Sequence, residues 1–125
     1  MSAKVLVVDD SAMSRRTLRR HLETAGYSVL EATDGMSALE LYFVEKPALV
    51  LLDLVMTGMY GLDVLARLRE IDPAAKVLIA SADIQSSTRQ MAEEAGASGF
   101  INKPFSASQI ADAVASALRG DNDPD

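Results

Sequence analysis

The stretch Lys4-Val5-Leu6-Val7-Val8-Asp9-Asp10 decides the fold, because its four apolar residues end abruptly in two acids. Two similar runs follow, Leu49–Leu52 before Asp53 and Val77–Ala80 before Ser81. Apolar runs that are continuous rather than alternating are typical of parallel strands covered by helices on both faces. Each run therefore predicts a buried strand that delivers a polar side chain to the edge of a sheet.

Five strand-like runs alternate with five helical patterns along the chain. The predicted strands are Lys4–Val8, Ser28–Ala32, Leu49–Asp53, Lys76–Ser81 and Gly99–Asn102. The predicted helices are Met13–Ala25, Met36–Glu45, Gly61–Ile71, Thr88–Ala95 and Ala107–Arg119. This alternation with short connections predicts an α/β domain with a doubly wound parallel sheet. In such sheets ligands bind outside the carboxyl ends of the strands.

Local signals place several helix ends. The spacing of a capping box occurs twice, at Ser87–Gln90 and at Ser106–Gln109. Asp34 precedes the second predicted helix and suits its N-cap. Gly26 and Gly96 follow two predicted helices, where a left-handed residue is favoured.

Composition restricts the class of protein. The chain has 125 residues, no cysteine and one histidine, which excludes disulfides, thiolate catalysis and zinc sites built from several histidines. We divide it into one domain, residues 1–120, and an acidic tail, residues 121–125, which we expect to be disordered. The formal net charge of -6 argues against direct binding to nucleic acid. Because no signal-peptide-like or membrane-spanning run occurs, we expect a cytoplasmic protein without membrane insertion.

Polar residues at the strand ends should meet at one edge of the sheet. They are Asp9 and Asp10, Asp53, Ser81, and Lys103 after the fifth strand. Acids at helix N-termini are also favoured by the helix dipole, but that explanation accounts for neither their convergence nor the lysine. Crowded carboxylates repel one another unless a cation neutralises them, and an all-oxygen set suits Mg²⁺, with Mn²⁺ as a substitute.

Phosphoryl transfer uses each of these residue types. Asp53 fits the role of a carboxylate nucleophile that forms an aspartyl phosphate. Lys103 would offset the charge of the transferring group, together with a metal that Asp10 holds directly or with Asp9 through water. Ser81 would donate a hydrogen bond to a phosphate oxygen.

Four motifs in order resemble the receiver domain of bacterial two-component response regulators, over roughly residues 3–119. The motifs are Val5–Ser11, Leu51–Met56 with Gly58 and Gly61, Ser81-Ala82, and Phe100–Phe105. The resemblance implies a flavodoxin-like receiver fold with strand order 2-1-3-4-5. It also implies phosphoryl transfer from a histidine to Asp53, and Mg²⁺ bound by Asp10, Asp53 and the backbone carbonyl of Val55. In that family the bond before Pro104 is cis.

The family resemblance also implies a switch. Ser81 moves toward the phosphoryl group, the aromatic residue at position 100 turns inward, and the face of the fourth helix, fifth strand and fifth helix changes. Phe100 has no hydroxyl, so we expect it to act through packing alone; a purely core role is equally open. Val55 and Asp83 occupy positions that affect the lifetime of the phosphoryl group in this family.

Arginines gather on one side of the first predicted helix, at Arg15, Arg16, Arg19 and Arg20. This side is either a solvated helix face or a surface that docks an acidic partner. In the family the first helix contacts the sensor histidine kinase or the histidine phosphotransfer domain. We therefore name Arg15 and Arg19 as candidate docking residues.

We expect a stand-alone, chemotaxis-type receiver that catalyses only its own phosphorylation and dephosphorylation. It would signal through a phosphorylation-dependent contact with a downstream protein that the sequence does not name. A Mg²⁺-dependent aspartyl-phosphate phosphatase of haloacid-dehalogenase type is the enzymatic alternative. It is disfavoured because Val55 stands where its second acid belongs and the chain has no room for a cap. A phosphorylation-independent pseudo-receiver is disfavoured because no site residue is missing.

Overall fold

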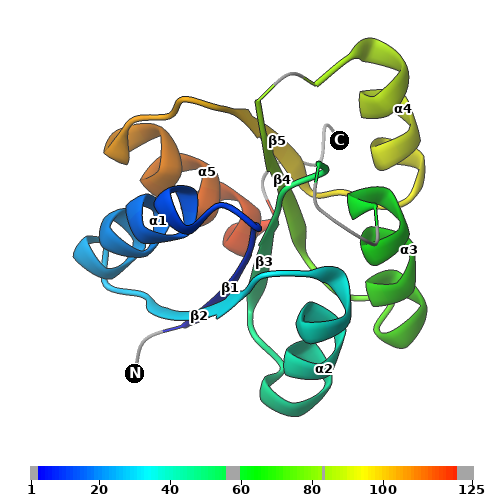
Figure 1. The fold of residues 1–125 in the computed structure, drawn as a ribbon, viewed down its shortest axis with the longest axis horizontal. Coiled ribbons are helices and arrows are strands. Elements are labelled where there is room, and N and C mark those ends of the chain that lie inside the picture. The colour runs from blue at the N-terminus through cyan, green and yellow to red at the C-terminus, as the bar shows by residue number, and fades with distance from the viewer. Residues whose placement is uncertain (1–2, 56–59, 83, 121–125) are drawn as a thin grey trace.

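The computed structural model of the chain describes residues 3–55, 60–82 and 84–120. Its centre is a parallel sheet of five strands in the order β2-β1-β3-β4-β5, with helices on both faces (Figure 1). This arrangement confirms the predicted doubly wound sheet and its strand order. The acidic tail, Met56, Gly58 and Asp83 lie outside the described residues.

All ten predicted elements are present. The strands are β1 (Lys4–Val8), β2 (Ser28–Ala32), β3 (Leu49–Leu52), β4 (Val77–Ser81) and β5 (Gly99–Asn102). The helices are α1 (Ala12–Thr24), α2 (Gly35–Glu45), α3 (Gly61–Ile71), α4 (Ser86–Glu94) and α5 (Ala107–Arg119). Boundaries shift most at α4, which begins before the predicted Thr88. The predicted cap at Ser87 is wrong, because Ser87 already lies inside the helix and Gln85 takes the N-cap position without a side-chain bond.

The other predicted helix ends are confirmed. The side chain of Asp34 accepts a hydrogen bond from the backbone N–H of Ser37 at 2.9 Å and caps α2. Ser106 and Gln109 form the reciprocal capping box of α5. Gly26 and Gly96 both have φ of 99°, the left-handed region that glycine tolerates after a helix.

The continuous apolar runs divide their side chains between two cores. Leu6 and Val8 of β1 point toward the core beneath α2, α3 and α4, whereas Val5 and Val7 point toward the core beneath α1 and α5. Both faces of the sheet are therefore buried, and Figure 1 shows α1 and α5 together on one side. Each fully buried Val or Leu side chain contributes roughly 1.5–3 kcal/mol by leaving water, which fixes the strands and thus the positions of their polar ends.

No helix within the described part of the chain is long and apolar enough to cross a membrane.

Candidate functional site

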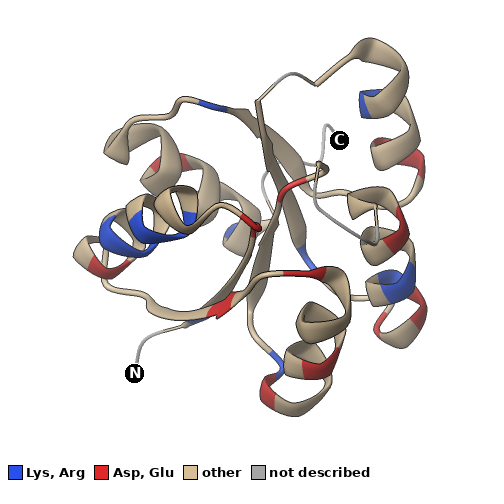
Figure 2. Cartoon of the chain, in the orientation of Figure 1, with Lys and Arg blue, Asp and Glu red and all other residues tan. Residues whose placement is uncertain are grey.

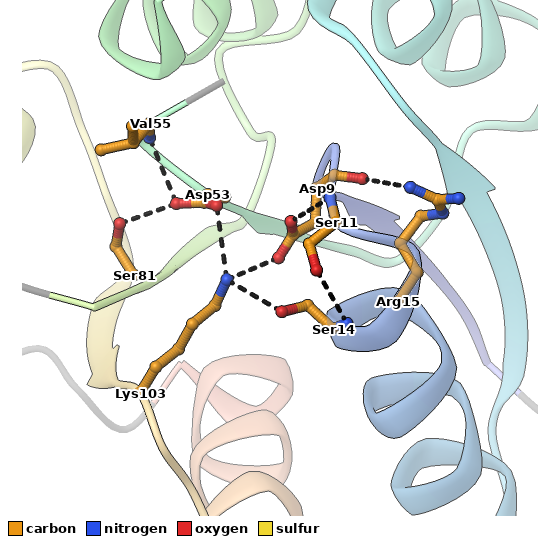
Figure 3. A network of polar contacts seen from close by, with 8 residues as sticks. All are labelled: Asp9, Ser11, Ser14, Arg15, Asp53, Val55, Ser81 and Lys103. Carbon is orange, nitrogen blue, oxygen red and sulfur yellow. Dashed lines mark hydrogen bonds and ion pairs between the residues drawn. The ribbon is translucent and has the colours of Figure 1, made fainter. Parts of the chain in front are cut away.

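The carboxyl end of β3 delivers Asp53 to the edge of the sheet. The backbone N–H of Asp53 donates to the carbonyl of Val8 at 3.0 Å, so the residue is held in line with β1. The residue is only 8% exposed. One carboxylate oxygen, Oδ1, accepts hydrogen bonds from the hydroxyl of Ser81 at 2.7 Å and from the backbone N–H of Val55 at 3.2 Å (Figure 3).

Asp9 follows β1 directly and is buried, with 1% of its surface exposed. Its Oδ1 accepts from the backbone N–H of Ser11 at 2.9 Å, and its Oδ2 accepts from Nζ of Lys103 at 2.7 Å. Ser11 is also the N-cap of α1, since its hydroxyl accepts from the backbone N–H of Ser14 at 3.2 Å. The start of the helix therefore fixes the direction of the Asp9 carboxylate.

Lys103 joins the two acids. Its ammonium lies 2.7 Å from Asp9 Oδ2 and 3.3 Å from Asp53 Oδ2, and it also donates to the hydroxyl of Ser14 at 3.2 Å. Its backbone N–H donates to the carbonyl of Ser81 at 2.9 Å, and the bond from Lys103 to Pro104 is cis. Burial alone would lower the pKa of Lys103, but the hydrogen bond to Asp9 and the charges of both acids raise it above its usual value. The side chain therefore stays positively charged at neutral pH.

Three carboxylates can meet a single cation here. Asp9, Asp10 and Asp53 each offer one oxygen, and these oxygens lie within 4.8 Å of one another. Figure 2 shows the acidic ends of β1 and β3 close together near the middle of the molecule. Three carboxylate oxygens so close together form a hard donor set that fits a divalent cation such as Mg²⁺.

Ser81 and Phe100 lie on neighbouring strands. Ser81 is 2% exposed at the end of β4, and Phe100 is half-buried on β5. The guanidinium of Arg89, on α4, lies 4.3 Å from the centre of the Phe100 ring. Phe100 therefore has an electrostatic attraction to a cation over its aromatic face in addition to its packing.

The comparisons with known proteins agree with this geometry. Residues 5–115 match the response regulator receiver domain, which is most of the chain. The chain belongs to the response regulator receiver family. Chemotaxis protein CheY of Thermotoga maritima is 41% identical over 115 residues, which are 91% of this chain and 96% of that protein. Sporulation initiation phosphotransferase F of Bacillus subtilis is 37% identical over 114 residues, which are 91% and 92% of the two chains.

Solved structures give the same result. Chemotaxis protein CheY4 of Vibrio cholerae superimposes on this receiver with a TM-score of 0.90 at 27% identity, and the match covers 94% of this chain and 99% of that one. The chain is thus a receiver domain of two-component signalling, and its carboxyl-edge acids correspond to a cluster that can bind a metal ion.

Two arginines of α1 have partners that the sequence-based prediction did not include. Arg15 and Arg19 do not stand free on α1, because both pair with the carboxylate of Glu31 on β2. Arg16 and Arg20, by contrast, are exposed. The sequence-based prediction missed Glu31. An acid inside an otherwise apolar strand is the signal that could have indicated a basic partner.

Proposed function

We propose that this receiver accepts a phosphoryl group on Asp53 from a histidine kinase or a phosphotransfer histidine, in a reaction that requires Mg²⁺. The observation that carries the proposal is the state of the Asp53 carboxylate. It is buried at the sheet edge, its Oδ1 is bonded to Ser81 and Val55, and its Oδ2 lies 3.3 Å from the ammonium of Lys103. A purely structural aspartate would not need two acidic neighbours beside it.

In this reaction an oxygen of Asp53 attacks the phosphorus atom. The bond between phosphorus and the histidine nitrogen breaks, and its electron pair stays on the imidazole. Lys103 already lies beside Asp53 and would offset the charge on the phosphoryl oxygens, which is the main task of a protein in this chemistry. A divalent cation bound at the carboxylates would neutralise the remaining charge.

The donors for that cation differ in how they are held. Asp9 is buried and its Oδ2 lies 2.7 Å from the ammonium of Lys103, so we expect Asp9 to hold the cation through water. Asp10 is exposed at the start of the turn, and with Asp53 and the backbone carbonyl of Val55 it would supply direct ligands. Mg²⁺ tolerates this division because it keeps several of its waters in proteins.

Signalling would begin at Ser81. Its hydroxyl donates to Asp53 Oδ1, an oxygen whose charge changes when the carboxylate becomes an acyl phosphate. The new phosphate oxygens compete for the hydroxyl, and only one arrangement of this loop pairs well with them. Phe100 lies on β5, the strand next to that of Ser81, and Arg89 of α4 lies over its ring. We therefore expect the face of α4, β5 and α5 to change and to contact a downstream protein.

Two positions are proposed to set how long the phosphoryl group lasts. Val55 is 76% exposed beside Asp53, and an apolar side chain there cannot orient an attacking water. Asp83 is proposed from its place in the sequence alone.

Intact mass spectrometry tests the proposal. The purified chain is incubated with phosphoramidate, a small donor with a phosphorus–nitrogen bond, and with Mg²⁺. We expect one added phosphoryl group in the wild type and in the exposed control Asp63→Asn, and none in Asp53→Asn or after chelation of the metal. Equal labelling of Asp53→Asn would contradict the proposal, and rapid turnover of a phosphomonoester would favour a phosphatase instead.

A further inference from the structure

Arg15 reaches the backbone of the acidic turn rather than the solvent. Its Nη1 donates to the backbone carbonyl of Asp9 at 2.8 Å (Figure 3). Its Nε donates to Glu31 at 3.1 Å. Its side chain is only 17% exposed. A planar guanidinium can bridge two acceptors in fixed directions, which a lysine cannot do.

The carbonyl that Arg15 binds fixes the orientation of the peptide group between Asp9 and Asp10. β1 ends at Val8, so the carbonyl of Asp9 lies beyond the last residue of that strand. This oxygen shares one rigid peptide plane with the backbone nitrogen of Asp10. The other side of Asp9 is fixed by its N–H, which donates to the carbonyl of Ala32 at 3.2 Å. Holding the carbonyl therefore fixes the rotation of the plane from which Asp10 departs.

Glu31 holds Arg15 in turn. It lies on β2 opposite Val7 of β1, so the sheet register fixes its distance from the acidic turn. Arg19, one turn further along α1, donates to the other carboxylate oxygen of Glu31 and also pairs with Glu23 at 3.0 Å. Two arginines thus face two glutamates, so Arg15 and Arg19 offer little net charge with which to attract an acidic partner.

We propose that Arg15 is a positioning residue for the divalent-cation site: it holds the Asp9–Asp10 turn through the Asp9 carbonyl, and Glu31 holds Arg15. The inference rests on the proposed function, since it concerns the same cation. It replaces the interpretation of Arg15 as a docking residue. It also gives Arg15 and Arg19 different roles, although both bind the same carboxylate.

Isothermal titration calorimetry of the full chain with MgCl₂ separates these roles. An effect of charge and an effect of positioning would change the Kd for Mg²⁺ in opposite directions. Removing a nearby positive charge by Coulomb's law alone would strengthen Mg²⁺ binding. Loss of a residue that orients a metal ligand typically weakens binding by ~10–100-fold, so we expect Arg15→Gln to raise the Kd for Mg²⁺ on the order of tenfold. The matched control Arg19→Gln removes the same charge from the same glutamate and should leave the Kd unchanged or lower.

Arg15→Lys is the second variant, to be used if circular dichroism shows that Arg15→Gln does not fold. It keeps the charge but cannot bridge both acceptors, so its Kd for Mg²⁺ should also rise. A folded variant with unchanged or tighter Mg²⁺ binding would overturn the inference. So would a parallel loss of kinase-dependent phosphorylation in Arg15→Gln and Arg19→Gln at unchanged Kd, which would favour docking.

The two proposals fail in different ways. A wild-type chain that neither binds Mg²⁺ nor takes up a phosphoryl group would overturn the proposed function. A wild-type chain that does both, with an Arg15→Gln variant that binds Mg²⁺ equally well, would overturn only the role of Arg15.

Discussion

The two edges of the sheet use polar side chains in opposite ways. At the carboxyl edge, Asp9, Asp53 and Lys103 share one network in which a single ammonium contacts two carboxylates. At the amino edge, three separate side-chain contacts each join two parts of the chain. These contacts are Tyr42 to Asp72 at 2.8 Å, Lys76 to the carbonyl of Leu118 at 2.7 Å, and Lys4 to Glu45 at 2.9 Å.

Charge balance explains the difference. The carboxyl edge holds three acids within reach of one cation, and Lys103 supplies only one positive charge. The amino-edge contacts need no further ion. Every buried side-chain nitrogen or oxygen in the described part of the chain has a partner, so the surplus at the carboxyl edge is one of charge and not of hydrogen bonding. We infer that the amino edge stabilises the fold, whereas the carboxyl edge is prepared for a ligand.

The largest expected effect comes from exchanging one lysine at each edge. Lys103→Met would leave the buried carboxylates of Asp9 and Asp53 without their cation and lower the free energy of unfolding by about 3 kcal/mol. It should also slow phosphorylation by roughly 100-fold, the loss typical of a group that stabilises charge in the transition state. Lys76→Met removes one hydrogen bond to a carbonyl, so we expect a loss of about 1 kcal/mol and an unchanged rate.

Urea denaturation with and without Mg²⁺ measures this contrast. Mg²⁺ should restore part of the stability of Lys103→Met, because it supplies positive charge to the same acids, and should not restore that of Lys76→Met. Equal losses in both variants, with the same response to Mg²⁺, would remove the distinction between the two edges.

A smaller effect is expected from a glycine at each edge. A Cβ on Gly61, the first residue of α3, would lie 2.5 Å from the Cα of Leu54 and 2.7 Å from the carbonyl oxygen of Asp53. Gly61→Ala should therefore lower the free energy of unfolding by about 2 kcal/mol through overpacking, and slow phosphorylation because Asp53 must shift. Gly26→Ala meets no atom within 4 Å but has φ of 99°, so backbone strain alone should cost about 1 kcal/mol.

Thermal unfolding and the phosphorylation rate separate these two glycines. Gly26→Ala should be less stable yet phosphorylated at the wild-type rate. A Gly61→Ala variant with normal rate and stability would show that α3 can move away from Asp53 at little cost.

The sequence predicted the residues that end each strand better than the contacts between elements, for a physical reason. Buried strands must end where water begins, so the apolar runs before Asp53 and Ser81 placed those residues from local pattern alone. The pairing of Arg15 with Glu31 depends instead on the register of β1 against β2. The contact of Arg89 with Phe100 depends on how α4 lies over β5. Neither packing relation is encoded in a periodic pattern.

The smallest expected effect concerns the pair of Tyr42 and Asp72 at the amino edge. Tyr42→Phe removes the hydrogen bond from the Tyr42 hydroxyl to Asp72 and should lower the free energy of unfolding by about 1 kcal/mol. Phosphorylation and Mg²⁺ binding should not change, because Tyr42 lies near the end of α2, at the edge of the sheet opposite the acidic turn. Tyr60→Phe, at a ring that is 72% exposed, is the control and should have no effect on stability.

The pH dependence of stability sharpens this last prediction. Burial and the bond to Asp72 raise the pKa of Tyr42 to about 12, so the stabilisation is complete below the ordinary tyrosine pKa near 10 and is lost as the pH rises through the folded value. The same bond lowers the pKa of Asp72, so its contribution is present above the ordinary aspartate pKa and is lost as the pH falls through the folded value. Urea titrations of wild type and Tyr42→Phe should therefore differ most near neutral pH and converge at both extremes. A difference that stayed constant from acid to alkali would mean that Tyr42 stabilises the amino edge by packing, and the contrast between the edges would then rest on Lys76 and Lys4.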